Sequence, residues 1–218
     1  PSSLLMNAAP AQVAGVGEIC LTTPCDREGK ISPHILAAAA VAGVGRVYKL
    51  GGAQAVAAFA YGTRTIPKVD IITGPGNKYV ALAKKMVFGH VAIDSIAGPS
   101  EVVVLADESA NPDFIVLDMF AQAEHDPDAS AVLITPSEKL AFAVRDAAMR
   151  RIGGMLRKEV ITGALSANGA IVITGSMEEA CRVSDMIAPE HLELHVASPW
   201  DVLTGIRHAG AVFMGAYS

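Results

Sequence analysis

The sequence alternates short apolar runs, rich in β-branched residues, with longer segments whose composition is typical of helices. The apolar runs predict strands at 18–23, 46–50, 69–73, 101–106, 131–135, 170–174, 192–196 and 211–214. The segments between them predict helices from 32 to about 43, and at 53–61, 77–87, 111–125, 137–156, 177–186 and 201–208. Strands joined through helices predict right-handed crossovers and mainly parallel sheets. The expected fold is therefore α/β, with Rossmann-like units that carry helices on both faces of their sheets.

The strand–helix pattern restarts after Gly98 and Pro99, which predicts two units, residues 1–97 and 98–218. Each unit would have a size that is usual for a domain. The chain begins with Pro1 rather than Met, and it stops directly after an apolar run. We therefore expect a piece of a longer protein, truncated at both ends.

The composition narrows the class of protein. Residues are 51% hydrophobic but only 5% aromatic, which suits parallel strands buried on both faces. The net charge of −5, without a basic stripe, argues against a nucleic-acid partner. No run approaches the roughly 18–20 apolar residues of a membrane span, and we expect no signal peptide, because the N-terminus lacks a charged region followed by an apolar block. Three cysteines without a Cys-x-x-Cys pair favour a reducing compartment, so we expect a cytoplasmic protein.

An ordinary dinucleotide-binding fingerprint, G-x-G-x-x-G between a strand and a helix, is missing. The segments 15–17 and 43–45 each lack the third glycine, and both precede strands. They are typical of helix C-caps instead. Any dinucleotide would therefore have to bind in another way.

Two other glycine-rich segments, 51–54 and 74–77, lie between a strand and a helix. In an open α/β sheet this is the carboxyl edge, where ligands bind, and a helix N-terminus there favours anions. Gln54 and Asn77 are the candidate recognition groups. The alternatives are close packing of the first helix on its sheet and a plain N-cap by Asn77.

Polar side chains in the second half suggest chemistry at two places. Gln122 and His125 are three residues apart near a helix end, so they share a face and could hold a metal, although a histidine stabilised by the helix C-terminus is the alternative. Glu190 and His191 pair a carboxylate with an imidazole, as acid–base catalysis near neutral pH requires, although a surface turn is the alternative. His195 alternates with apolar residues and is expected to be structural.

Eight short segments, taken together and in order, closely resemble the histidinol dehydrogenase family. They are Gly-Gly-Ala-Gln-Ala from 51, Ala-Tyr-Gly-Thr from 60, Pro-Lys-Val-Asp from 67, Gly-Pro-Gly-Asn from 74, Ile-Asp from 93, Ala-Gly-Pro-Ser-Glu from 97, Gln-Ala-Glu-His from 122 and Ala-Pro-Glu-His-Leu from 188. The resemblance runs from Pro1 to Ser218, the middle portion of a family chain about twice as long.

The resemblance implies a role for each matching residue. Gln122 and His125 would bind zinc and, through it, the substrate. Glu190 and His191 would be catalytic, with His191 also contacting the substrate. Ser100, which by itself suggests only a turn, would contact the substrate as well.

The resemblance also implies an NAD site that contains Gln54 and Asn77. Further groups would lie outside this chain: a zinc-binding Asp past Ser218, a His from the partner subunit of a homodimer, and a Tyr before Pro1 that helps to bind NAD. Two protein ligands make a weak zinc site compared with four, so the chain alone is expected to bind zinc poorly and to be inactive.

The implied reaction is the oxidation of L-histidinol to L-histidine, a four-electron change that uses two NAD. Zinc would bind the amine and ring nitrogens, His191 would take the alcohol proton, and Glu190 would activate water at the aldehyde stage. An aldehyde dehydrogenase would need a nucleophilic cysteine, and Cys20, Cys25 and Cys181 have no such context. The other alternative is an inactive α/β fragment that keeps only nucleotide or ligand binding.

Overall fold

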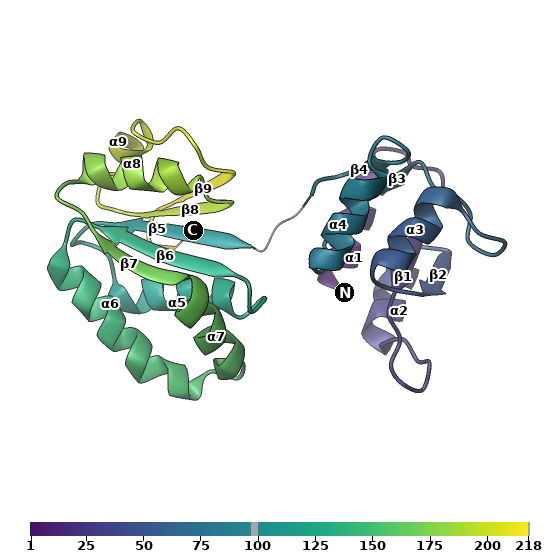
Figure 1. Cartoon of the computed structure of the whole chain (residues 1–218), viewed down its shortest axis with the longest axis horizontal. Coiled ribbons are helices and arrows are strands. Elements are labelled where there is room, and N and C mark those ends of the chain that lie inside the picture. The colour runs from purple at the N-terminus through teal and green to yellow at the C-terminus, as the bar shows by residue number, and fades with distance from the viewer. Residues whose placement is uncertain (97–99, 218) are drawn as a thin grey trace. The chain divides into compact units, whose positions relative to one another are not determined.

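The computed structural model describes residues 1–96 and 100–217, and it divides into two compact units, Pro1–Gly98 and Pro99–Ser218 (Figure 1). The break expected at Gly98 and Pro99 lies outside the described residues. Both units are α/β with parallel strand pairing, as the sequence predicts. Among the described residues, no helix is long and apolar enough to cross a membrane.

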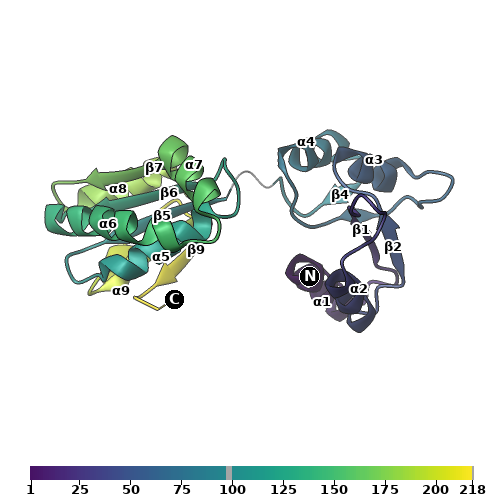
Figure 2. The same ribbon diagram turned by 90° about the horizontal axis from the view of Figure 1, so that it is seen from below.

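The first unit contains two small parallel sheets, β1 with β2 and β3 with β4. Its elements are α1 (Ser2–Val13), β1 (Cys20–Thr23), α2 (Pro33–Val41), β2 (Arg46–Lys49), α3 (Ala53–Tyr61), β3 (Ile71–Ile72), α4 (Lys78–Val87) and β4 (Ala92–Ile93). Helices α3 and α4 pack side by side over a core that includes Val56, Phe59 and Val87 (Figure 2). The glycines at 15 and 43 have positive φ just after α1 and α2, which confirms the predicted C-caps.

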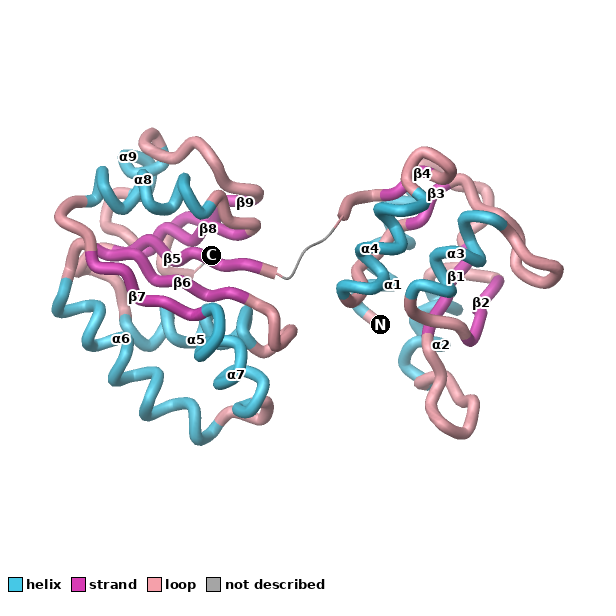
Figure 3. The backbone as a smooth tube through the Cα atoms, in the orientation of Figure 1, coloured by secondary structure: helices cyan, strands magenta, loops and turns pink. Residues whose placement is uncertain are grey.

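The second unit contains one parallel five-stranded sheet of order β7-β6-β5-β8-β9. Its elements are β5 (Glu101–Ala106), α5 (Pro112–Ala123), β6 (Ser130–Thr135), α6 (Glu138–Arg151), the 3-10 turn η1 (Ile152–Gly154), α7 (Lys158–Asn168), β7 (Gly169–Ile173), α8 (Met177–Ile187), β8 (His191–His195), α9 (Pro199–Leu203) and β9 (Ala211–Met214). Helices α5, α6 and α7 cover one face of the sheet, and α8 and α9 cover the other (Figure 3).

The side-chain alternation of β8 decides which residues face α5. Leu192 and Leu194 belong to the core under α8 and α9. Successive strand residues point to opposite faces, so His191, Glu193 and His195 point to the α5 side. This strand therefore presents an apolar face to one helical layer and a polar face to the other.

Parallel strands begin at a common edge of the sheet. The register pairs Glu101 with Ser130, Val102 with His191, and His191 with Ala211. Helix α5 crosses from the end of β5 back to the start of β6, so its C-terminus returns to this amino edge. The ends of elements that are distant in sequence thus meet there.

Several elements differ from the prediction, among them α1 and β4, which were not predicted. The helix expected at 137–156 ends at Arg151, because the glycines of η1 interrupt it. Helix α7 was not predicted, since Thr162, Gly163 and Ser166 are poor helix formers; its buried Ile161 packs into the core and stabilises it. The helix expected at 201–208 is instead the short α9.

Candidate active site

A left-handed residue leads into the Glu190–His191 pair. Ala188 ends α8 with φ of 53°, the one positive value found for a non-glycine residue in the described parts of the chain. That conformation costs about 1–2 kcal/mol for a residue with a Cβ. The next strand fixes the turn, because Gly210 N donates to Pro189 O and Ala211 N donates to Glu190 O, each at 2.9 Å. Such retained strain is often found at functional sites.

The Glu190 carboxylate is exposed at the amino edge and is tied to β5. Its Oε2 accepts a hydrogen bond of 3.3 Å from the backbone N–H of Glu101. Ser100 directly precedes that residue, and its carbonyl accepts a bond of 3.2 Å from Ser130 N. Ser130 and Glu190 therefore bind the two sides of the Ser100–Glu101 peptide group, which brings Ser100 next to Glu190.

His191 begins β8 and is half-buried. Its ring packs edge-on against Phe213, with centroids 5.7 Å apart and planes at 68°. The Phe213 ring is thus an apolar neighbour of the imidazole. The structure brings Ser100, Glu190 and His191 to one edge of the sheet, as the expected substrate and catalytic roles require.

Gln122 lies in the last turn of α5, and the exposed His125 lies just beyond it. The backbone N–H of His125 donates to Gln122 O at 3.2 Å, so the chain is still turning as a helix there. The Gln122 Nε2 atom is buried and has no hydrogen-bond partner among the described residues. Buried amides are nearly always paired, so this unpaired donor needs an explanation.

A polar seam between α5 and β8 joins the two pairs. Asp118 contacts His195 from α5, and α5 runs antiparallel to β8. One helical turn from Asp118 to Gln122 advances about 6 Å toward the amino edge. Two residues from Glu193 to His191 advance about 6.6 Å in the same direction. Gln122 therefore lies on the amino-edge side of Asp118, as His191 lies on the amino-edge side of Glu193.

The edge used by these residues could not be foreseen from general rules. Ligands of open α/β sheets usually bind outside the carboxyl ends of the strands. Here the candidate groups of the second unit occupy the opposite, amino edge. Only the strand register places them together.

In the first unit, Gln54 and Asn77 each follow the carboxyl end of a strand. Gln54 is exposed in the first turn of α3, folded over Gly52, where a Cβ would lie 3.0 Å from its Oε1 and where φ is 74°. Asn77 caps α4: its Oδ1 accepts from Tyr79 N and Val80 N, both at 3.1 Å. The N-cap proposed as the alternative role of Asn77 is therefore present, and an NAD contact would be additional to it.

The 74–77 segment is held by an ion pair between a buried lysine and a more exposed aspartate, which was not predicted from the sequence. Lys84 is 3% exposed, and its Nζ donates to Gly74 O at 3.0 Å and to Asp94. Asp94 in turn accepts from Gly74 N at 2.8 Å. Burial raises the pKa of Asp94, but the bonds from Lys84 and from the Gly74 and Ser95 amides outweigh it and keep that pKa below its usual value. Hydrogen bonds thus hold both the carbonyl oxygen and the N–H of Gly74.

Parallel sheets, a glycine-rich strand–helix junction and clustered acid–base side chains are features of α/β enzymes. The family model described as histidinol dehydrogenase matches residues 1–218. Relatives of that name from Chlorobaculum tepidum and Chlorobium luteolum are each 78% identical over the whole chain, which covers 51% and 49% of them. The crystal structure of histidinol dehydrogenase from Elizabethkingia anophelis has a TM-score of 0.94 and 41% identity, with 100% of this chain and 50% of that chain covered.

The chain therefore belongs to the histidinol dehydrogenase family. It spans about half the length of the curated relatives that it matches.

Proposed function

We propose that this chain supplies the catalytic portion of an enzyme that oxidises L-histidinol to L-histidine, with NAD as the electron acceptor and with zinc. The observation that carries the proposal is the gathering of Ser100, Glu190 and His191 at the amino edge of the sheet, to which the end of α5 with Gln122 also returns. Membership of the family supports the substrate. We further propose a homodimer in the cytoplasm, which contacts neither nucleic acid nor membrane.

The residues at the end of α5 fit zinc by their chemistry. Gln122 offers an amide oxygen and His125 offers a ring nitrogen, about one helical turn apart, and the Nε2 of the same Gln122 amide has no hydrogen-bond partner among the described residues. Zinc bound there would act as a Lewis acid for the amino and imidazole nitrogens of histidinol. Zinc usually takes four ligands, so the remaining ones would come from elsewhere in a longer protein or from its partner subunit.

The 51–54 and 74–77 segments fit a dinucleotide. Their glycines let the backbone approach a ligand closely, and α4 presents its positive N-terminal end behind Asn77. Gln54 is exposed at the corresponding turn of α3. NAD bound there would supply the hydride acceptor.

The proton steps belong to the residues of β8 and of the turn before it. His191 accepts the hydroxyl proton of histidinol at a ring nitrogen while a hydride leaves the carbinol carbon. Glu190 then accepts a proton from the water that adds to the aldehyde carbon. After His191 has released its first proton to solvent, it accepts the proton of the resulting hydrate as the second hydride leaves for a second NAD, which yields the carboxylate. Ser100 beside Glu190 would position the substrate.

The test uses a protein of the relatives' full length that carries this chain, assayed for NADH formation from histidinol and from histidinal. His191→Asn should lower kcat by about 10²–10⁴ with both substrates. Glu190→Gln should retain the first oxidation and lose most of the second. His208→Asn, an exposed histidine, is the matched control. Equal losses in both steps for Glu190→Gln, or full activity of His191→Asn, would contradict these roles.

A further inference from the structure

His195 is not a satisfied structural histidine. It is 3% exposed, yet neither its Nδ1 nor its Nε2 has a hydrogen-bond partner within the described residues. Glu193 Oε2 is also buried without one. Buried polar side chains are rarely left unpaired, and each such case needs an explanation. Two adjacent cases on one strand face suggest a missing common partner.

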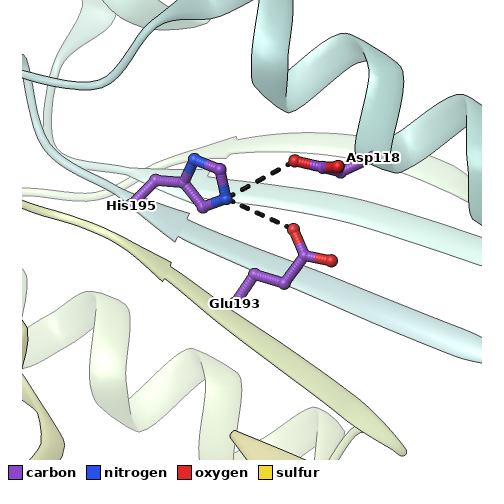
Figure 4. A group of neighbouring side chains, drawn as sticks. All are labelled: Asp118, Glu193 and His195. Carbon is purple, nitrogen blue, oxygen red and sulfur yellow. Dashed lines mark ion pairs between the residues drawn. The ribbon is translucent and has the colours of Figure 1, made fainter. Parts of the chain in front are cut away.

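The distances between the three side chains indicate that this partner is an ion. His195 Nε2 lies 3.3 Å from Glu193 Oε2 and 3.5 Å from Asp118 Oδ2, and the ring points between the two carboxylates (Figure 4). Charge-assisted hydrogen bonds are shorter, about 2.7–2.9 Å. Two ligands of a tetrahedral ion with bonds of about 2.0–2.2 Å lie roughly 3.3–3.6 Å apart. The spacing therefore fits ligands around one ion better than direct hydrogen bonds.

Within the described part of the chain, no lysine or arginine forms an ion pair with Asp118 or Glu193. Burial, and then the negative charge of Glu193, raise the pKa of Asp118 to about 6. Two crowded carboxylates of this kind are stabilised by a bound cation. The ligand atoms of the three residues all lie within 4.8 Å of one another.

The cluster also has an entrance. Asp118 is the most exposed of the three side chains, at 36%. It lines a pocket of about 230 Å³ together with Phe114, Leu117, Ala216 and Tyr217. A hydrated ion can therefore reach the carboxylate before it contacts the buried histidine.

We propose that Asp118, Glu193 and His195 bind a divalent first-row transition-metal cation. These residues differ from Gln122 and His125, to which the proposed function assigns zinc. An imidazole beside two carboxylates suits Zn²⁺, Mn²⁺ or Co²⁺ better than Ca²⁺ or Mg²⁺, which prefer oxygen ligands alone. The inference does not depend on the proposed dehydrogenase activity.

The experiment uses the 218-residue chain with Gln122→Ala and His125→Ala, so that the other candidate metal ligands are removed. After treatment with a chelator and dialysis, the chain is titrated with Co²⁺ and followed by visible absorption. We expect one equivalent to bind with d–d bands typical of nitrogen and oxygen ligands. Adding Glu193→Gln should weaken binding at least roughly tenfold. Glu108→Gln, an exposed residue outside the cluster, is the matched control.

Circular dichroism establishes that each variant is folded. If Glu193→Gln does not fold, Asp118→Asn at the open side of the cluster provides the same test. A second readout is thermal unfolding followed by Trp200 fluorescence, which Co²⁺ should shift upward only when the cluster is intact. The proposal is overturned if the background chain binds no Co²⁺, if the cluster variants bind as tightly as the control, or if Ca²⁺ binds equally well.

Discussion

Lys84 reaches from α4 to the carbonyl oxygen of Gly74, 3.0 Å away, and so fixes the first residue of the glycine-rich segment that precedes the helix. The same ammonium group pairs with Asp94, which holds the N–H of that glycine. One buried cation thereby sets the backbone on which the proposed NAD contacts depend.

Replacing this cation should loosen the segment. We expect Lys84→Met to lower the stability of the first unit by about 1–3 kcal/mol, because Gly74 O and Asp94 lose a buried donor. NAD affinity should fall roughly tenfold through misplacement of the backbone. Calorimetric titration with NAD and amide hydrogen exchange of α4 measure the two effects. Lys85→Met, at the exposed neighbouring position, should change neither.

The acid stability of the first unit should depend on Asp94. The folded state lowers the pKa of this carboxyl, so its contribution is present above the unfolded value of about 3.9 and is lost as the pH falls through the folded-state pKa. Asp94→Asn should therefore be less stable than the parent at pH 7, with a difference that shrinks below about pH 4. Denaturant unfolding at several pH values measures this difference. A gap that stayed constant down to acid pH would show that the charge of Asp94 is not responsible.

Two glycine-to-alanine substitutions should have opposite signs. A Cβ at Gly76 would lie 2.5 Å from the Val80 side chain, so Gly76→Ala should destabilise by about 1–3 kcal/mol and displace the proposed NAD segment. A Cβ at Gly163, inside α7, would meet nothing within 4 Å. Gly163→Ala should stabilise by about 0.5–1 kcal/mol. Unfolding in denaturant compares the two, and stabilisation by Gly76→Ala would refute the close packing there.

Relief of backbone strain should be measurable at Ala188. Ala188→Gly removes the Cβ that opposes a positive φ, for a net stabilisation of up to about 1 kcal/mol after the extra unfolded-state entropy of glycine. Trp200, the only tryptophan, lies in the same unit and reports its unfolding. Ala180→Gly, at a buried position within α8 with ordinary helical φ, should destabilise instead.

The helices and strands could be predicted from the sequence only where local residue patterns decide them. The run at 101–106 was placed correctly because apolar β-branched residues between turns form buried strands. The run at 211–214 was also placed correctly, although β9 is mostly exposed. Helix α3 was placed correctly by its glycine boundaries at 52 and 62. Helix α1 was not predicted, since its sequence includes Pro10 and has little amphipathic pattern.

The residues of the candidate sites also divide into those that local spacing could suggest and those that depend on contacts between distant elements. Glu190–His191 and Gln122–His125 are local pairs, so spacing alone could suggest them. The pairing of Lys84 with Asp94 and the cluster around His195 depend on contacts between elements, and the alternation of His195 with leucines looked like an ordinary core pattern. Distances through space, such as that from Asp118 to His195, leave no signal in a single sequence.

The side-chain alternation of β8 places the acid–base histidine and two residues of the cation cluster on the same face of the sheet. His191, Glu193 and His195 point to one face only because the strand keeps its pairing with Val102 to Ala106 of β5. Deleting one residue from the 188–190 turn would shift this register by one residue. All three side chains would then point into the apolar layer under α8, and Leu192 and Leu194 would point toward α5. A single deletion there would thus abolish acid–base chemistry and the inner cation cluster together, whereas substitutions separate them.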